Sequence, residues 1–329
     1  MRQSNIELCR IVSIILVLLV HSAFAANGYP KELNSSSLWL IILESISIIG
    51  VNVFIFISGY FSIKLKPKTI YTIVLTVAFY FILLTGISLA MGKPIQGKNL
   101  LFISNSHYFI IDYLGLALLS PILNKFADNS SKKVLLTTLS VLIAYQTYFG
   151  CITEAASTEF DAGYSLMSFA IIYMLARYIR IYNVPSIFER YSGIMYLACT
   201  FSLIVASIIL LKFGYSGALH RVYAYNNPIV IVSAIFFFLF FKKMNIGNNK
   251  YINHIAKSTL GILLFHASTP AVPSVWAFMK KTFTHLADNL NFVNIFYWGG
   301  CIIAIALAAI VVDQIRIYII DRIFKTTNK

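Results

Sequence analysis

The sequence predicts an all-α, polytopic transmembrane helical bundle of about ten spans, with both the N- and C-termini in the cytoplasm. Of the 329 residues, 59% are hydrophobic and only 12% are charged, whereas soluble domains carry about 25% charged residues. Long apolar stretches recur along the whole chain with short loops between them. We therefore expect one membrane domain over residues 1–329, surrounded by the lipid bilayer.

Ten apolar stretches are long enough, or nearly so, to cross about 30 Å of hydrocarbon. The fifth and the eighth are short, and the last is long enough to continue past the membrane as an amphipathic tail. The expected spans are 5–24, 38–61, 68–91, 108–126, 134–149, 165–182, 191–212, 227–241, 258–279 and 292–320.

The distribution of positive charge sets the expected orientation. The formal net charge is +14, and lysine and arginine gather in alternate connections between the expected spans. This pattern is the positive-inside rule, and it places both ends of the chain inside. Because the basic residues sit between apolar runs and not on one soluble face, we expect no nucleic-acid partner. The sequence also lacks metal-ligand spacing, a phosphate-binding loop and a nucleophile motif.

The first expected span carries three ionisable residues, Glu7, Arg10 and His21. An ionisable residue at membrane depth is costly and marks a functional site. Arg10 and His21 are eleven residues apart, so they share one helix face about 16 Å apart along the axis. Glu7 lies one turn before Arg10 and can pair with it. The alternative interpretations are a snorkelling anchor for Arg10 and an interfacial histidine for His21.

The second expected span contains Asn52 near its middle and Ser58 near its inner end. The amide of Asn52 needs hydrogen-bond partners at this depth. Gly50, Ser58 and Gly59 are small, and small residues are typical of close helix packing. Three lysines follow this span on the expected inner side: Lys64, Lys66 and Lys68.

Further polar residues stand near the ends of later spans. The fourth span holds Asp112 and Tyr113 near its outer end and then contains Ser120-Pro121, where the proline should kink the helix and free a carbonyl group. Asp112 is either an interfacial carboxylate or part of a site. The eighth span begins at Asn226 and Asn227-Pro228, which also suit a helix start with Asn227 as cap. The ninth span carries His266, for which a neutral histidine bonded to a neighbouring helix is the alternative.

These segments resemble, in order, the motifs of the integral-membrane acyltransferase family 3. Glu7, Arg10 and His21 match its Arg-x10-His signature, and GVNVFIFISGYF at 50–61 resembles its second-helix motif. Residues 108–125 resemble its Tyr-rich, Leu-Ser-Pro segment, 224–242 its Tyr-Asn-x-Pro helix and 258–266 its closing Gly-Ile-x-Leu-x-His motif. One departure stands out: members often carry an arginine pair after the second motif, where this chain has lysines, which offer charge without a bidentate fork.

The resemblance implies transfer of an acyl group, most simply acetyl, from acetyl-CoA to a hydroxyl of a cell-surface polysaccharide or its lipid-linked precursor, at the bacterial cytoplasmic (inner) membrane. The acyl-CoA is a donor substrate, with no permanently bound cofactor and no metal. His21 then acts as general base or as acyl carrier. Arg10, oriented by Glu7, binds the donor's phosphates or stabilises an oxyanion.

The same resemblance assigns the remaining polar residues to the two substrates. The donor side comprises Arg10, Lys64, Lys66 and Lys68. The acceptor side comprises Asn52, Ser58, Asp112, Tyr113, Asn226 and His266.

Two other classes of function fit the same residues. A transporter or flippase would use Arg10 and His21 as a relay or an anion site, and it would yield no acylated product. A scaffold subunit of an envelope glycan pathway would use the polar residues only to hold helices together. In a scaffold, substitution of His21 would lower the protein level together with the phenotype.

Overall fold

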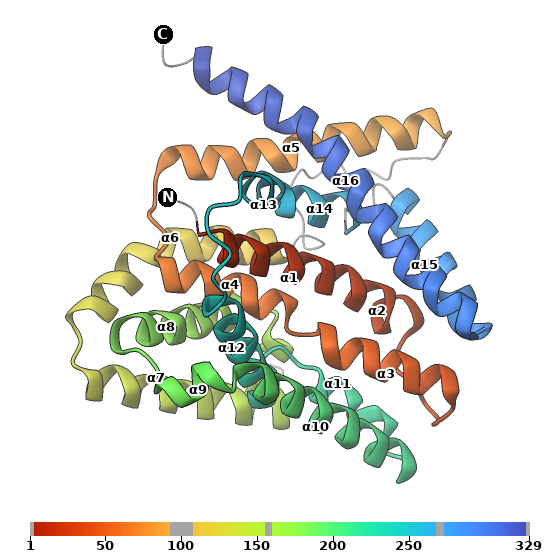
Figure 1. The fold of residues 1–329 in the computed structure, drawn as a ribbon, viewed down its shortest axis with the longest axis horizontal. Coiled ribbons are helices and arrows are strands. Elements are labelled where there is room, and N and C mark those ends of the chain that lie inside the picture. The colour runs from red at the N-terminus through yellow and green to blue at the C-terminus, as the bar shows by residue number, and fades with distance from the viewer. Residues whose placement is uncertain (1–2, 93–107, 155–159, 268–272, 327–329) are drawn as a thin grey trace.

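The computed structural model describes residues 3–92, 108–154, 160–267 and 273–326, and these residues form helices and turns without a strand. Most of the helices are long rods arranged side by side (Figure 1). The α-helices are α1 Ser4–Ser22, α2 Phe24–Asn27, α3 Ser35–Ser47, α4 Gly50–Phe61, α5 Pro67–Ala90, α6 Tyr108–Asn129, α7 Lys132–Gln146, α8 Leu166–Tyr182, α9 Ser186–Arg190, α10 Ser192–Lys212, α11 Leu219–Val222, α12 Pro228–Lys242, α13 Lys250–Ile255, α14 Thr259–His266, α15 Pro273–Asp288 and α16 Phe292–Thr326.

Seven continuous helical stretches in the described residues are long and apolar enough to cross a membrane. They are α1–α2, α3–α4, α5, α6, α7 with its helical continuation to Ile152, α10 and α16. The apolar α12, with 15 residues, is shorter. The prediction of an all-α polytopic protein is confirmed, whereas the count of ten spans stays a prediction. The start of α1 and the end of α16 lie toward the same side of Figure 1. The cytoplasmic location of the two chain ends also stays a prediction.

Two of the expected spans differ from a single regular helix. The second is one continuous stretch in which α3 and α4 meet at Ile48 and Ile49. The expected ninth span, 258–279, is not one helix, and this part of the prediction is wrong. Helix α14 ends at His266, and α15 begins at Pro273. Proline lacks an N–H group and is preorganised for a first helical turn, so a new helix starts there.

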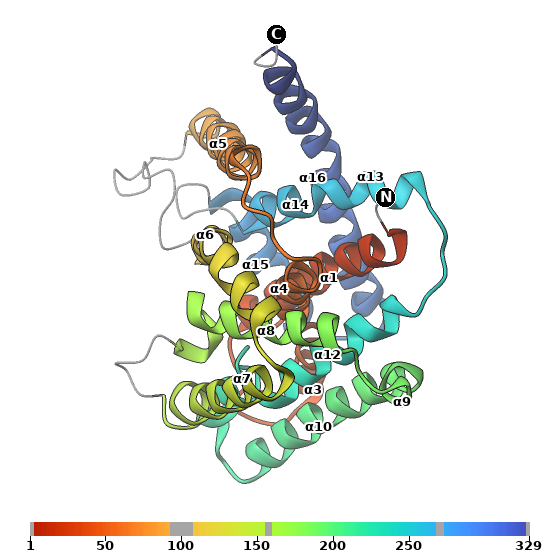
Figure 2. The same cartoon turned by 90° about the vertical axis from the view of Figure 1, so that its left-hand side faces the viewer.

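Helix α1 lies in the middle of the bundle, and the views agree on its neighbours (Figures 1 and 2). Helices α5, α14 and α16 lie on one side of it, and α7 and α10 lie on the other. It packs directly against α3, α4, α12 and α14. At its crossing with α4, a Cβ on Gly50 would come within 2.9 Å of the Ser13 carbonyl oxygen. The glycine therefore allows the two backbones to approach closely, as small residues do between membrane helices.

Helix α4 also packs closely against α8. A side chain at Gly59 would collide with the backbone of Tyr173, so the predicted packing role of Gly59 is confirmed. The Tyr173 hydroxyl accepts a hydrogen bond from Ile63 N at 2.9 Å and donates one to Asn124 Oδ1 at 2.7 Å. Asn124 in turn donates to the Ile63 carbonyl at 3.0 Å. These bonds fix the start of the connection that carries the three lysines toward α5.

Two prolines that the sequence analysis singled out lie in helices, Pro121 inside α6 and Pro228 at the start of α12. Helix α6 continues through Pro121, which cannot bond the carbonyl of Ala117 four residues earlier. The Ser120 hydroxyl donates to that freed carbonyl at 2.7 Å, which explains why serine precedes the proline. Helix α12 begins as predicted, with Pro228 in the first turn and Asn227 Oδ1 accepting from Ile229 N at 2.9 Å.

A buried ion pair ties α14 to α16 and α5. Asp313 and Arg316 are both buried, and the guanidinium donates twice to the carboxylate, at 2.9 and 2.5 Å. The Tyr80 hydroxyl of α5 donates to the same carboxylate at 3.0 Å. Gly261 of α14 lies directly against Asp313 and Tyr80, where a Cβ would collide with both. Arg316 also donates to the Lys257 carbonyl at 3.2 Å, so this cluster fixes the position of α14.

Candidate active site

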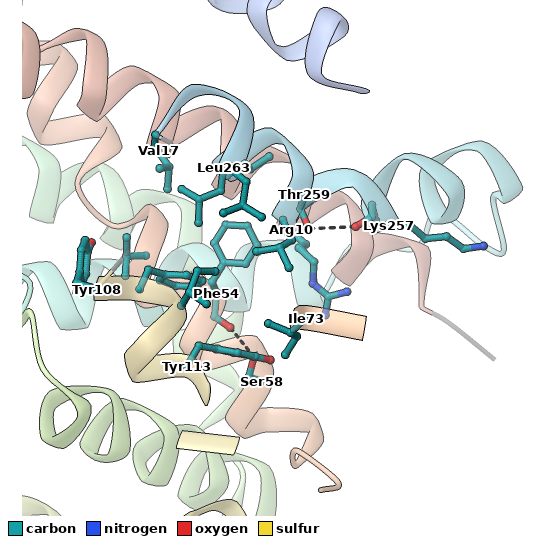
Figure 3. Close-up of a pocket in the computed structure, with 18 of the residues that line it drawn as sticks. Arg10, Val17, Phe54, Ser58, Ile73, Tyr108, Tyr113, Lys257, Thr259 and Leu263 are labelled. Carbon is teal, nitrogen blue, oxygen red and sulfur yellow. Dashed lines mark hydrogen bonds between the residues drawn. The ribbon is translucent and has the colours of Figure 1, made fainter. Parts of the chain in front are cut away.

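A cavity of about 1150 Å³ opens beside α1. Its walls come mainly from α1, α4, α5, α6 and α14 (Figure 3). Trp276 of α15 also lines it. Arg10 and His21 both line it, so the face that they share on α1 is the face that borders the cavity. They mark two ends of the site, separated by three helical turns, or about 16 Å.

Positive charge gathers at the Arg10 end. Arg10 Nη1 donates to both oxygens of Glu7, at 3.1 and 2.8 Å, which is the pair that the spacing predicts. The Arg10 side chain is 28% exposed and that of Glu7 is 8% exposed. Lys68, in the first turn of α5, lines the same end, and Lys257 borders it with an ammonium group that points away from Arg10 (Figure 3). Because Glu7 occupies only one nitrogen, the guanidinium keeps donors for an anion.

Between the two ends the walls are mainly apolar. Helices α1, α4, α5, α6 and α14 contribute Ile14, Val17, Val51, Phe54, Ile73, Phe109, Ile110, Leu260, Leu263 and Leu264. The main polar element in this zone is a hydrogen bond of 3.2 Å between the hydroxyl groups of Ser58 and Tyr113 (Figure 3). These walls suit a neutral, flexible chain and disfavour a charged one.

The opposite end contains two histidines and two large aromatic residues. His21 Nδ1 lies 2.9 Å from His266 Nε2. The Trp276 ring stands edge-on to the His21 ring, with centroids 5.7 Å apart and an interplanar angle of 80°. Tyr108 and Ala25 complete the lining here. An imidazole is thus presented to the cavity next to a half-buried tryptophan.

Several predicted site residues lie away from the lining. Asn52 is buried and donates to the Tyr225 carbonyl at 2.8 Å, while Asn226 donates to the Phe160 carbonyl at 3.1 Å. Both amides therefore connect segments distant in sequence. His266 is fully buried behind His21, and Asp112 is half-buried on α6. The exposed Lys64 and Lys66 precede the one lysine of the three that reaches the cavity.

Other residues at the site were not predicted from the sequence. Lys257 stands just before α14, and its position among the basic residues of an inner connection was the available signal. Trp276 fell inside the expected ninth span, so its return toward His21 followed only from the break in that span. Glu44 is a buried carboxylate on α3 that accepts from Phe24 N at 3.2 Å, beyond the outer end of α1; no motif marked it.

The family model described as "Acyltransferase domain", of the acyltransferase 3 type, matches residues 3–313 of the chain. The chain therefore belongs to acyltransferase family 3, as its five motifs indicate. No curated protein and no solved structure matches the chain. The family match makes the protein a membrane acyltransferase in general terms.

Proposed function

We propose that the protein transfers an acetyl group from acetyl-CoA to a hydroxyl of a cell-surface polysaccharide or of its lipid-linked precursor, at the bacterial cytoplasmic membrane. The observation that carries the proposal is the polarity of the cavity beside α1. One end holds Arg10 and Lys68, the middle is apolar and the other end presents His21. An acyl-CoA has the same order of properties: anionic phosphates, a neutral flexible arm and a thioester at the far end.

The separation of the two ends distinguishes between the roles open to Arg10. An oxyanion forms at the thioester carbon, and in this pose that carbon lies beside His21. Arg10 is about 16 Å away along α1, which is far beyond hydrogen-bond reach. The arrangement thus supports phosphate binding by Arg10 and argues against oxyanion stabilisation. Lys68 adds charge at the same end, and Glu7 orients the guanidinium.

The reaction needs an unprotonated nitrogen of His21. In the general-base route, this nitrogen takes the proton of the acceptor hydroxyl while the hydroxyl oxygen attacks the thioester carbon. The C–S bond then breaks, and the leaving CoA sulfur takes the proton from the imidazole. In the acyl-carrier route, the same nitrogen attacks the thioester carbon and the C–S bond breaks, so that CoA leaves as a thiolate. The acceptor hydroxyl oxygen then attacks the acyl carbon, the C–N bond breaks, and the hydroxyl proton neutralises the thiolate. Trp276 borders the space in which the acceptor would lie.

The test compares cells that produce the wild type, His21→Ala, Arg10→Ala and a control, His285→Ala. His285 is exposed and lies outside the cavity lining. We expect O-acetyl on the purified surface glycan to fall strongly in the first two variants and to stay unchanged in the control, with equal membrane protein levels on a blot. Unchanged acetylation in His21→Ala would refute the proposal. Loss of protein together with acetyl would favour a scaffold.

A further inference from the structure

His266 is a buried histidine whose two ring nitrogens both have partners. Its Nε2 lies 2.9 Å from His21 Nδ1, and its Nδ1 lies 2.5 Å from the carbonyl oxygen of Ile262, one turn earlier on α14. The ring is 0% exposed and is not part of the cavity lining. His266 therefore cannot touch a substrate in the cavity, and its contact with His21 is its route to the chemistry.

These contacts fix the positions of the protons. A carbonyl oxygen only accepts, so His266 Nδ1 must carry a proton and donate it. None of the ion pairs found in the described part of the chain includes His266, and a buried charge without a counter-ion is costly. His266 is accordingly neutral, and its Nε2 accepts. His21 Nδ1 must then be the donor, which leaves the lone pair of neutral His21 on Nε2.

We propose that His266 is a positioning residue that holds His21 in the Nδ1–H tautomer, with Nε2 unprotonated on the cavity side. This inference rests on the proposed function, because both the general-base and the acyl-carrier routes require that lone pair. Without it, His21 can place its proton on Nε2 and become inactive in either route. The hydrogen bond also limits rotation of the His21 ring, which makes a T-shaped contact with the Trp276 ring as well.

The surrounding structure holds His266 in place for this task. The Ile262 carbonyl belongs to the same helix turn, so the hydrogen bond to Nδ1 moves with α14. The buried ion pair of Asp313 and Arg316 fixes α14 against α16, with Gly261 in direct contact. The geometry of the two histidines therefore depends on the docking of α14 and not on a mobile side chain.

The first experiment measures the tautomer directly. Wild type and variants are labelled with nitrogen-15 histidine, reconstituted in nanodiscs and studied by NMR, with the His21 signals assigned through their loss in His21→Ala. Protonated and unprotonated imidazole nitrogens differ widely in shift. We expect Nδ1 of His21 to be protonated and Nε2 to be unprotonated in the wild type. We expect His266→Phe to mix the two tautomers, while His266→Gln, which offers a side-chain oxygen as acceptor, retains the wild-type form.

The second experiment measures rate, as transfer from radiolabelled acetyl-CoA to glycan in membranes from producing cells, per amount of enzyme. Loss of the productive tautomer should lower the rate about 10²–10⁴-fold in His266→Phe. We expect His266→Gln to stay within about tenfold of the wild type, since it restores the acceptor, and the exposed His285→Gln to have no effect. Rescue by glutamine separates a positioning role from general destabilisation, and it keeps the test valid where His266→Phe fails to fold.

Three results would overturn the inference. The first is a His21 proton on Nε2 in the wild type, and the second is an unchanged His21 tautomer in His266→Phe. The third is equally low rates in His266→Gln and His266→Phe at normal protein level. Failure of the proposed function looks different: His21→Ala would then keep its acetyl transfer, whatever the NMR shows about the tautomer.

Discussion

Arg10 and Lys68 should control the affinity for the acyl donor, and Lys64 provides a matched control. Arg10 is partly buried in the cavity wall at 28% exposure, and hydrogen bonds to charged groups contribute about 1.5–3 kcal/mol. Arg10→Gln should therefore raise the KM for acetyl-CoA about 10- to 150-fold. Lys68 is exposed, where charge pairs contribute about 0.2–1 kcal/mol, so Lys68→Gln should raise it about 1.5- to 5-fold. Lys64→Gln should leave it unchanged.

The assay is the initial rate of transfer from radiolabelled acetyl-CoA to glycan in membranes, over a range of donor concentrations. Phosphate contacts far from the reacting carbon bind the ground state and the transition state alike, so the effect belongs in KM and not in kcat. Arg10→Gln also removes the ion pair that Glu7 makes with Arg10 in a buried position. The Glu7→Gln/Arg10→Gln double variant controls for this, and Arg10→Lys should show an intermediate KM because it keeps the charge but loses the fork.

Two outcomes would refute this reasoning. If Lys64→Gln raised the KM as much as Lys68→Gln, general surface charge would explain the effect and the cavity would not. If Arg10→Gln lowered kcat at an unchanged KM, Arg10 would act on the transition state, and the assignment of the two cavity ends would be wrong.

Three further predictions concern the walls of the site. Trp276→Leu should lower acetyl transfer while leaving the donor KM unchanged, and Trp276→Phe should retain more activity; a changed donor KM would contradict its place on the acceptor side. Gly261→Ala should destabilise the protein by about 1–3 kcal/mol through overpacking, whereas Gly299→Ala, where nothing lies within 4 Å of the new Cβ, should melt at or above the wild-type temperature in detergent. Asp313→Asn leaves Arg316 buried without a countercharge, which costs about 3–5 kcal/mol, so most of the folded fraction on size-exclusion chromatography should be lost. If the Asp313→Asn protein were as stable as the wild type, the buried ion pair would not be what fixes the position of α14.

Much of the site on α1 follows from the sequence. Periodicity alone places Arg10 and His21 on one helix face, and the three-residue spacing predicts the ion pair of Glu7 with Arg10. The small residues Gly50 and Gly59 identify close helix crossings, and the Asn227-Pro228 pair identifies a helix start. These features are local, because they depend on spacing within one helix or one turn.

Contacts between distant segments did not follow from the sequence. His21 and His266 are 245 positions apart. The periodicity of α1 shows which of its residues share a face, but it does not predict which other helix packs against that face. Asn52 and Asn226 have the polarity of substrate ligands, yet each bonds a backbone carbonyl of another segment. A buried amide bonds whichever partner the packing provides. An asparagine that binds a substrate and one that bonds a backbone carbonyl therefore look the same in the sequence.

The sequence by itself determined the membrane-embedded, all-helical class of the protein, its acyltransferase family and the polar face of its first helix. Those properties depend on composition, order of motifs and helical period. The tertiary structure alone decided that one lysine of three reaches the cavity, that α14 and α15 are separate helices, and that His266 lies against His21 outside the cavity lining. These depend on how helices dock against one another, and docking is set by side chains far apart in the chain.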